Sequence, residues 1–203
     1  MTPTAPNTRY FMTYSFFALI SRMKNIDRWA LMRNADRENV MEHSHMVAVL
    51  AHALAVIRRD VCGLDCSPDR AAAAALFHDA PEIFTGDMPT PVKYHDEEMI
   101  AAYRRVESGA IRKLISSLPE AMRPEYGALL SEENGVEDLV RAADKLSAYI
   151  KCLEELKTGN LEFKSAADST LKKLRAMDIP EVDYFLTHFI PAFEMTLDEL
   201  SDF

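Results

Sequence analysis

The chain has 203 residues, 48% of them hydrophobic, and a formal net charge of −9 at pH 7. This length fits one large domain, and a chain so rich in apolar residues can fill a substantial core. The acidic balance excludes wholesale binding to nucleic acid polymers, because such binding requires a basic face.

The start of the chain and its cysteines favour a cytoplasmic protein. No basic region followed by an apolar core opens the sequence, and no continuous apolar run approaches the length of a membrane span. Cys62, Cys66 and Cys152 lack partners at zinc-finger spacing, so we interpret them as reduced thiols. We therefore expect no membrane partner.

Every predicted element is a helix. Residues 1–9 hold two prolines and several threonines, so we expect a disordered tail there. Apolar positions at helical spacing predict helices over residues 10–22, 40–61, 68–78, 96–118, 136–156, 161–177 and 181–189. We find no strand pattern, internal repeat or heptad run, and the sequence predicts an all-α fold in one domain, residues 10–203.

A basic segment lies between the first two predicted helices and contains the only tryptophan, Trp29. Its cations are Arg22, Lys24, Arg28, Arg33 and Arg37. One interpretation is a solvated loop with a half-buried tryptophan. The other is an anion site, because the planar guanidinium of arginine matches phosphate oxygens.

The helix over residues 40–61 carries three histidines, of which one or two at most should be functional. His43 is the best candidate because it follows Glu42 near the helix start. His52 lies between alanines and fits the core as well as any site.

Residues 78–82, His-Asp-Ala-Pro-Glu, follow an alanine-rich run and place three chemically strong groups within five residues. On a helix, Glu82 would share a face with His78, while Asp79 would point about 100° away. The next stretch, residues 85–93, is rich in turn residues and should not form a regular helix. Such a loop is a common place for substrate contacts.

Asp144 lies within the helix predicted over residues 136–156, between Ala143 and Lys145. It is either a charge on the wet face, paired with a neighbouring cation, or a carboxylate close to the buried side that needs a partner such as a metal. His43, His78, Asp79 and Asp144 together would suit a divalent transition ion and leave positions open for water and substrate.

This H…HD…D arrangement resembles the signature of the HD-domain phosphohydrolase superfamily. Five segments are similar to the motifs of bacterial 5'-deoxynucleotidases: NIDRW (25–29), ENVMEHS (38–44), HDAPE (78–82), GDMPTPVK (86–93) and ADKL (143–146). The resemblance spans about residues 11–200 and departs mainly at Pro81, where a small polar residue is familiar, and in a longer N-terminal tail. It implies an HD-type helical bundle, usually homodimeric, that removes phosphate from deoxyribonucleoside 5'-monophosphates in preference to ribonucleotides.

The resemblance also implies roles for particular residues. His43, His78, Asp79 and Asp144 would bind one divalent ion, with Co²⁺ expected in vitro and Mn²⁺, Zn²⁺, Fe²⁺ or Cu²⁺ as alternatives. The substrate would meet Arg28 at its phosphate, Trp29 and Asp87 at its sugar, and further contacts from His43, Asp79, Met88, Pro89 and Thr90. A large indole leaves little room for a 2'-hydroxyl, and a carboxylate accepts a hydrogen bond from a 3'-hydroxyl.

The mechanism we expect is attack of metal-bound water on phosphorus, in line with the departing 5'-oxygen. Glu82 would donate a proton to that oxygen, which requires a raised pKa, and Arg28, with help from Lys93, would offset phosphoryl charge. The alternatives are hydrolysis of nucleoside triphosphates or cyclic nucleotides, a metal-stabilised nucleotide sensor without catalysis, and ordinary charges on a helical domain.

Overall fold

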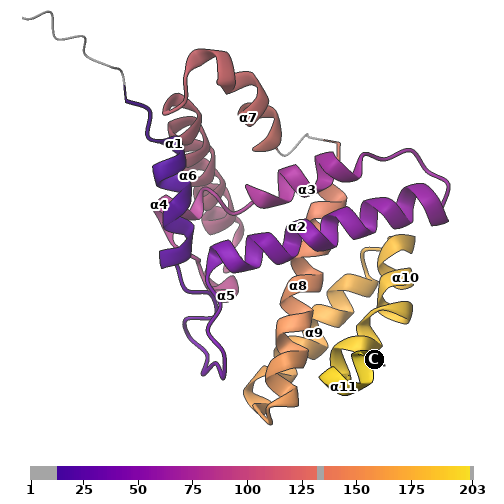
Figure 1. The fold of residues 1–203 in the computed structure, drawn as a ribbon. Helices are drawn as coiled ribbons and strands as arrows, with labels where there is room; N and C mark the ends of the chain where they lie inside the picture. The colour runs from indigo at the N-terminus through magenta and orange to yellow at the C-terminus, as the bar shows by residue number, and fades with distance from the viewer. Residues whose placement is uncertain (1–12, 132–134, 202–203) are drawn as a thin grey trace, which may run out of the picture.

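The computed structural model describes residues 13–131 and 135–201, and the predicted tail, residues 1–9, lies outside them. The chain folds into helices joined by short connections (Figure 1). The α-helices are α1 (Phe16–Ile20), α2 (Val40–Val56), α3 (Pro68–Leu76), α4 (Glu82–Thr85), α5 (Thr90–Lys93), α6 (Glu97–Ser116), α7 (Arg123–Leu129), α8 (Glu137–Lys157), α9 (Lys164–Arg175), α10 (Pro180–His188) and α11 (Leu197–Leu200). Between them lie 3₁₀ turns η1 (Ser21–Asn25), η3 (Glu120–Met122), η4 (Leu161–Phe163) and η5 (Ile190–Glu194), and one π-helical turn, η2 (Ile57–Val61).

The all-α prediction is confirmed: in the described part of the chain the strand-like pairing is confined to one isolated bridge, Asp27 with Asn39. Helix α2 is the centre of the fold, packed between α3 and α8 (Figure 1). Its buried side chains, including Leu54 and Ala51, share one core with the small residues of α3 and with Leu146 of α8. The alanines of α3 let its backbone approach α2 closely, and the packing of these helices with α8 brings the start of α2, the end of α3 and the N-terminal half of α8 together around one site.

Helix α2 with η2 is also the one described stretch long and apolar enough to cross a membrane, with 22 residues and a mean hydropathy of 1.4. In its most apolar window, 56% of the residues are buried inside the protein. A helix at the centre of a protein core can have the same length and apolar composition as a membrane span.

The N-terminal helix differs from its prediction. The helix α1 begins at Phe16 and passes into η1 at Ser21, while residues 10–12 lie outside the described part. Phe16 and Met23 are buried in a second core with Leu114 and Leu118, whereas Tyr14 and Phe17 are exposed. Helix α1 has only five residues, so it is too short to keep one helical face inward over the predicted range, residues 10–22.

Two further local predictions were wrong. Helix α3 ends at Leu76, and hydrogen bonds to the third preceding residue carry the chain through turns to α4, so residues 78–82 do not share one helix. Residues Thr90–Lys93 form a one-turn helix, α5, in the stretch expected to be irregular. Helix α7, which the sequence reasoning did not predict, has Pro124 in its first turn, where a proline costs no hydrogen bond.

Residues 26–39, between η1 and α2, are anchored to the C-terminal half of α8. The Glu155 carboxylate accepts hydrogen bonds from the amides of Ala35 (2.8 Å) and Asp36 (3.2 Å), and from the side chain of Asn160 (2.8 Å). Lys151 donates to the Asp36 carbonyl (2.5 Å) and to Glu155 (2.6 Å). Both charged side chains are buried, at 6% and 1% exposed, so this loop is fixed by a buried ion pair.

Candidate metal centre and active site

Three predicted metal ligands meet at the point where α2, the turn after α3, and α8 converge. Each of His43, His78 and Asp144 offers one donor atom, and these atoms all lie within 4.8 Å of one another. Asn39 caps α2 by accepting from the amides of Met41 and Glu42, which fixes the helix start at Val40, three residues before His43. Two imidazoles and a carboxylate brought together in this way match the donor preferences of divalent transition ions.

The two imidazoles are oriented as metal-binding histidines are. His78 Nδ1 lies 2.7 Å from the Ala75 carbonyl, and His43 Nδ1 lies 3.2 Å from Ser147 Oγ. Each ring therefore directs Nε2 toward the cluster, and an outer partner holds the other nitrogen, as is usual for ligating histidines. Among the described residues, His78 Nε2 is buried and has no hydrogen-bond partner of good geometry. A buried nitrogen in that condition is well suited to a cation.

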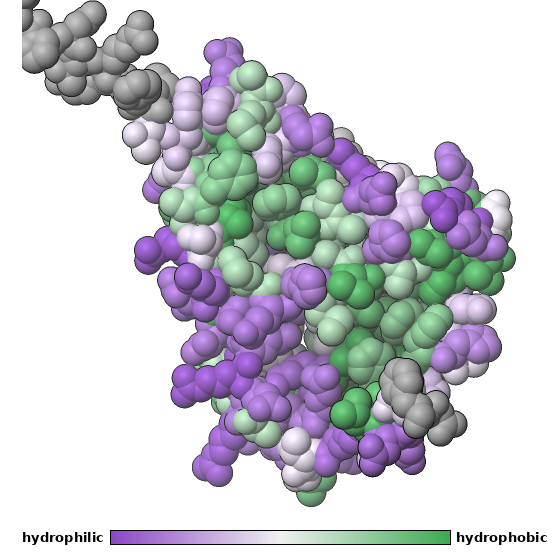
Figure 2. Space-filling view, in the orientation of Figure 1, coloured by the Kyte–Doolittle hydropathy of each residue, from purple (hydrophilic) through white to green (hydrophobic). Residues whose placement is uncertain are grey.

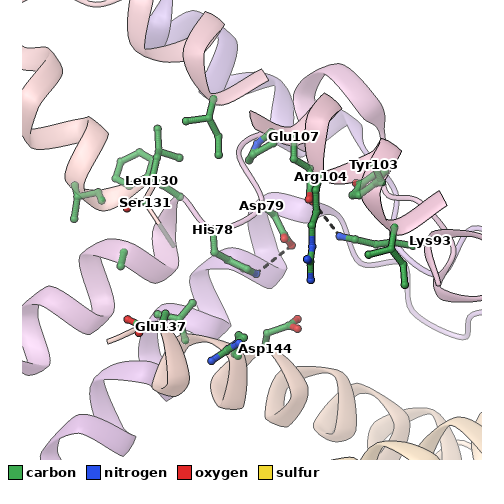
Figure 3. Close-up of a pocket in the computed structure, with 18 of the residues that line it drawn as sticks. His78, Asp79, Lys93, Tyr103, Arg104, Glu107, Leu130, Ser131, Glu137 and Asp144 are labelled. Atoms are coloured by element: carbon green, nitrogen blue, oxygen red, sulfur yellow. Dashed lines mark hydrogen bonds and ion pairs between the residues drawn. The ribbon is translucent and has the colours of Figure 1, made fainter. Parts of the chain in front are cut away.

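Asp79 lies beside these three donors. Its Oδ2 is 3.6 Å from His43 Nε2 and 3.4 Å from the guanidinium of Arg28. It also lies 3.2 Å from His78 Nε2, and Figure 3 shows these two side chains facing each other. Burial would raise the pKa of Asp79, but the charges of His78, His43 and Arg28 outweigh it and hold the pKa below its ordinary value. The carboxylate is thus ionised and within reach of both the cluster and the nearest arginine.

Opposite charges also set the protonation of His78 and Asp144. Burial alone would lower the pKa of His78, but the charge of Asp79 raises it to about 9. Burial would raise the pKa of Asp144, yet the hydrogen bond from His43 (Nε2 to Oδ1, 3.1 Å) and the imidazole charges lower it to about 2. A cation at this site must therefore displace a proton from an imidazole, so its affinity falls as the pH falls.

Glu82 is the first residue of α4 and is only 7% exposed. Its Oε2 has no hydrogen-bond partner among the described residues. Burial, with the charges of Asp79 and Asp87, raises the pKa of Glu82 to about 9. This carboxyl group holds a proton at neutral pH, which is the state that a general acid requires.

Arg28 and Trp29 lie next to the cluster and share one partner, Glu38. Arg28 Nε (3.3 Å) and Trp29 Nε1 (3.1 Å) both donate to Glu38 Oε2. The carboxylate of Asp87 accepts a hydrogen bond from the Trp29 backbone, while burial keeps the pKa of Asp87 above its ordinary value. Trp29 has a φ of 56°, a left-handed conformation that costs a bulky residue about 1–3 kcal/mol and recurs at functional sites.

The rest of the predicted substrate loop is less closely tied to the cluster. Met88 and Pro89 are half-buried and Thr90 is exposed, and within the described chain none of the three makes a side-chain hydrogen bond to another predicted site residue. Lys93, expected to help with phosphate, pairs with Glu107 at 3.1 Å and lies over the Tyr103 ring. Its charge is already neutralised by that carboxylate.

A cavity of about 600 Å³ opens in front of the cluster. His78, Asp79 and Asp144 line one side, and Lys93, Tyr103 and Arg104 line the other (Figure 3). Figure 3 shows the Arg104 side chain reaching into this space from α6. A volume of this size suits a small organic ligand such as a mononucleotide.

The sequence reasoning missed Arg104, and it gave no role to Glu38 although that residue opens the second motif. Both contributions arise from contacts between distant segments, and no local pattern marks them. The histidines of α2 divide clearly: His43 is fully buried in the site, whereas His45 and His52 are exposed, so the suggestion that His52 belongs to the core was wrong.

Comparisons with known proteins agree with this geometry. The model of the family "5'-deoxynucleotidase YfbR-like" matches residues 15–193. A 5'-deoxynucleotidase of Vibrio parahaemolyticus is 47% identical over 189 residues, covering 92% of this chain and 97% of that protein. Among solved structures, an HD-domain phosphohydrolase from Listeria innocua is 26% identical with a TM-score of 0.77, over 88% of both chains. A predicted metal-dependent phosphohydrolase from Magnetospirillum magnetotacticum is 27% identical with a TM-score of 0.62, over 85% of this chain and 87% of that one.

Proposed function

This chain belongs to the family of YfbR-like 5'-deoxynucleotidases and is a metal-dependent phosphohydrolase with the HD-type fold; from that premise we propose that it hydrolyses deoxyribonucleoside 5'-monophosphates to deoxyribonucleoside and phosphate. The observation that carries the proposal is the convergence of donor atoms from His43, His78 and Asp144 within 4.8 Å of one another, with Asp79 Oδ2 3.2 Å from the buried Nε2 of His78. A protonated Glu82 close by supplies the second requirement of phosphate ester hydrolysis, a proton for the leaving group.

We assign His43, His78, Asp79 and Asp144 to one divalent ion. When bound, such an ion lowers the pKa of water and neutralises phosphoryl charge. The donor set is mixed, with nitrogen and oxygen atoms only, which fits Co²⁺, Mn²⁺, Zn²⁺, Fe²⁺ or Cu²⁺ better than Mg²⁺. Structural zinc sites usually close their shell with Cys and His, so this set favours a site that serves catalysis.

Arg28 is placed to bind the phosphoryl group. Its Nε is held by Glu38 and its Nη1 by Asp79, so the planar group keeps a fixed orientation at the edge of the cluster. A substrate phosphate bound at the cluster would take up the remaining donors of Arg28 and pair with a full positive charge. Positioned donors of this kind stabilise charge as it builds on the phosphoryl oxygens.

Glu82 would complete the reaction by donating its proton to the departing 5'-oxygen. Burial keeps the carboxyl neutral until the bond breaks, after which the positive groups around it stabilise the carboxylate. Among these groups, the charges of Arg28 and Lys93 lower the pKa of Glu82 and so favour its ionised form. The group would then recover its proton from water as the products leave.

Selection of the sugar would depend on Trp29 and Asp87. The indole packs on Phe163 and shares Glu38 with Arg28, and the carboxylate of Asp87 is held by the Trp29 backbone. A 2'-hydroxyl would meet the ring, whereas a 3'-hydroxyl could donate to the carboxylate. Crowding of this sort gives a preference and not absolute exclusion.

The decisive experiment removes metal with a chelator, restores Co²⁺, Mn²⁺, Zn²⁺ or Mg²⁺ in turn, and measures phosphate release from matched deoxy and ribo 5'-monophosphates. We expect no release from the stripped protein and recovery with a transition ion, faster for the deoxy series. Binding without release under every metal would favour a nucleotide sensor and reject hydrolysis.

A homodimer in the cytoplasm remains our expectation. Large apolar side chains such as Phe17, Val49 and Leu76 are exposed, and apolar residues gather over the upper and right-hand parts of the face seen in Figure 2. A second copy could cover part of that surface. Light scattering coupled to size-exclusion chromatography would report the mass directly, and a mass of one chain at micromolar concentration would reject the dimer.

A further inference from the structure

The carboxylate of Glu38 lies close to three side chains of the site, those of Arg28, Trp29 and His43. One oxygen, Oε2, accepts hydrogen bonds from Arg28 Nε at 3.3 Å and Trp29 Nε1 at 3.1 Å. The other oxygen, Oε1, lies 3.8 Å from His43 Nδ1. With its side chain only 15% exposed, Glu38 is largely withdrawn from solvent.

The backbone brings the same residues together a second time. The Arg28 amide donates to the Glu38 carbonyl at 2.9 Å, and the Val40 amide to the Ile26 carbonyl at 2.9 Å. These bonds close residues 26–40 into a narrow loop with Trp29 just beyond the closure. The Glu38 side chain therefore reaches its two donors without any movement of the chain.

Trp29 needs this support because its backbone is strained. A φ of 56° is unfavourable for a side chain of this size, and such conformations persist only where several contacts enforce them. The ring packs on Phe163, with centroids 5.3 Å apart, and the Asn34 amide donates to the Trp29 carbonyl at 3.3 Å. Glu38 supplies the remaining constraint, because its bond to Nε1 stops the indole from turning about its own axis.

We propose that Glu38 is a positioning residue that fixes Arg28 and Trp29 relative to each other, so that phosphate binding and exclusion of the 2'-hydroxyl depend on one carboxylate. This inference rests on the proposed function. Because both donors meet the same oxygen, a displacement of Glu38 would move the guanidinium and the indole together. Loss of Glu38 would therefore weaken phosphate binding and relax sugar selection in the same variant.

The test compares the wild type with Glu38→Ala, Glu38→Gln and a control, Asp36→Asn. Asp36 lies in the same loop with an exposed side chain, and its substitution removes one negative charge without touching Arg28 or Trp29. A glutamine carbonyl can still accept from both donors, so Glu38→Gln should retain much of the geometry and separate position from charge. Circular dichroism confirms that each variant is folded.

Two measurements follow on the same proteins. Trp29 is the only tryptophan in the chain, so acrylamide quenching of tryptophan emission, without metal or substrate, reports the indole alone. Kinetics with matched deoxy and ribo 5'-monophosphates then give KM and the ratio of kcat/KM values. For Glu38→Ala we expect stronger quenching, a KM for the deoxy substrate raised about 10-fold, and a deoxy-to-ribo ratio that falls several-fold. Glu38→Gln should lie between Ala and the wild type, and Asp36→Asn should match the wild type.

Unchanged quenching in Glu38→Ala would overturn the proposal, since the indole would then be held without Glu38. A changed indole with an unaltered deoxy-to-ribo ratio would overturn it as well, by removing Glu38 from selection. If the wild type released no phosphate from any nucleotide, the proposed function would fail together with the selective role of Glu38. The quenching result would still decide whether Glu38 holds the indole.

Discussion

Replacing Glu155 with glutamine tests whether the loop that carries Arg28 and Trp29 is held by a buried charge. The carboxylate accepts from two loop amides, from Asn160 and from Lys151, and it is 1% exposed. Glutamine has nearly the same volume, so the substitution removes the charge without leaving a cavity. It also leaves the ammonium of Lys151 buried without its ionic partner.

Two arguments give a similar loss of folding free energy for Glu155→Gln. Burial would raise the pKa of Glu155, but its bonds from Lys151, the loop amides and Asn160 lower it from 4.5 to about 2. A tenfold change in proton affinity is worth about 1.4 kcal/mol, so this shift corresponds to about 3 kcal/mol of stability at neutral pH. Removing one member of a buried ion pair costs about 3–5 kcal/mol in other proteins. For a chain of this length, about 3 kcal/mol lowers the melting temperature by about 6–12 °C.

The direction of this pKa shift determines how the stability contribution of Glu155 changes with pH. Because the pKa of Glu155 is lower in the folded protein than in the unfolded chain, its contribution is complete above about pH 4.5 and is lost as the pH falls toward 2. By this linkage the difference between wild type and Glu155→Gln should shrink to less than half between pH 6 and pH 3.

Urea unfolding followed by circular dichroism measures these free energies. Glu154→Gln is the matched control, since Glu154 is the adjacent carboxylate on α8 and is exposed, and it should stay within about 0.5 kcal/mol of the wild type. A Glu155→Gln variant as stable as that control at pH 7, or a difference that does not shrink on acidification, would refute the reasoning.

Other predictions concern the site and one turn. Glu82→Ala should keep its metal content, measured by elemental analysis, and lose about 10²–10⁴-fold in kcat; a near-normal rate would remove Glu82 from the mechanism. Arg28→Lys should raise KM for deoxynucleotides about 10-fold in steady-state assays, because lysine lacks the planar fork. Restoring metal at 100 times its Kd should raise the free energy of unfolding of the stripped protein by about 2.7 kcal/mol in urea titrations. Gly86→Ala should cost about 1–3 kcal/mol by the same titration, since φ of 70° with ψ of 169° is a conformation that essentially only glycine adopts, although its Cβ would meet nothing within 4 Å.

The longer helices could be predicted because their signals are local. The capping residue and first-turn proline of α3, and the apolar periodicity of α2, α6 and α8, depend only on neighbouring residues. Short elements gave no such signal: α5 and α7 each place a proline in the first turn, where the residue is compatible with a helix and with a loop alike. The relation between His78 and Glu82 was misjudged because α3 ends at Leu76 and turns follow it, in which Ala80 is buried in the second core.

The chemistry of the site was easier to predict than its support. His43, His78 and Asp144 lie close together, as expected. They could be predicted because a shared ion explained imidazoles and carboxylates at these positions better than any other role did. Glu38 and Glu155 read as ordinary acidic residues of a charged chain, and each gains its role from partners far away in sequence. Glu155 bonds to residues 119 and 120 positions earlier, a distance over which single-sequence patterns carry no information.

One face of helix α8 bonds to the site and to the loop beside it at regular intervals. Asp144, Ser147, Lys151 and Glu155 follow one another at steps of three and four residues, so they lie on one face, and all four bond to the segment between Ala35 and His43. One inserted or deleted residue between Asp144 and Glu155 would turn one end of this row by about 100° relative to the other. The metal-facing end and the loop-holding end could then no longer face the same segment. Length changes among related chains should therefore fall outside residues 144–155, and this stretch fixes the register for aligning them.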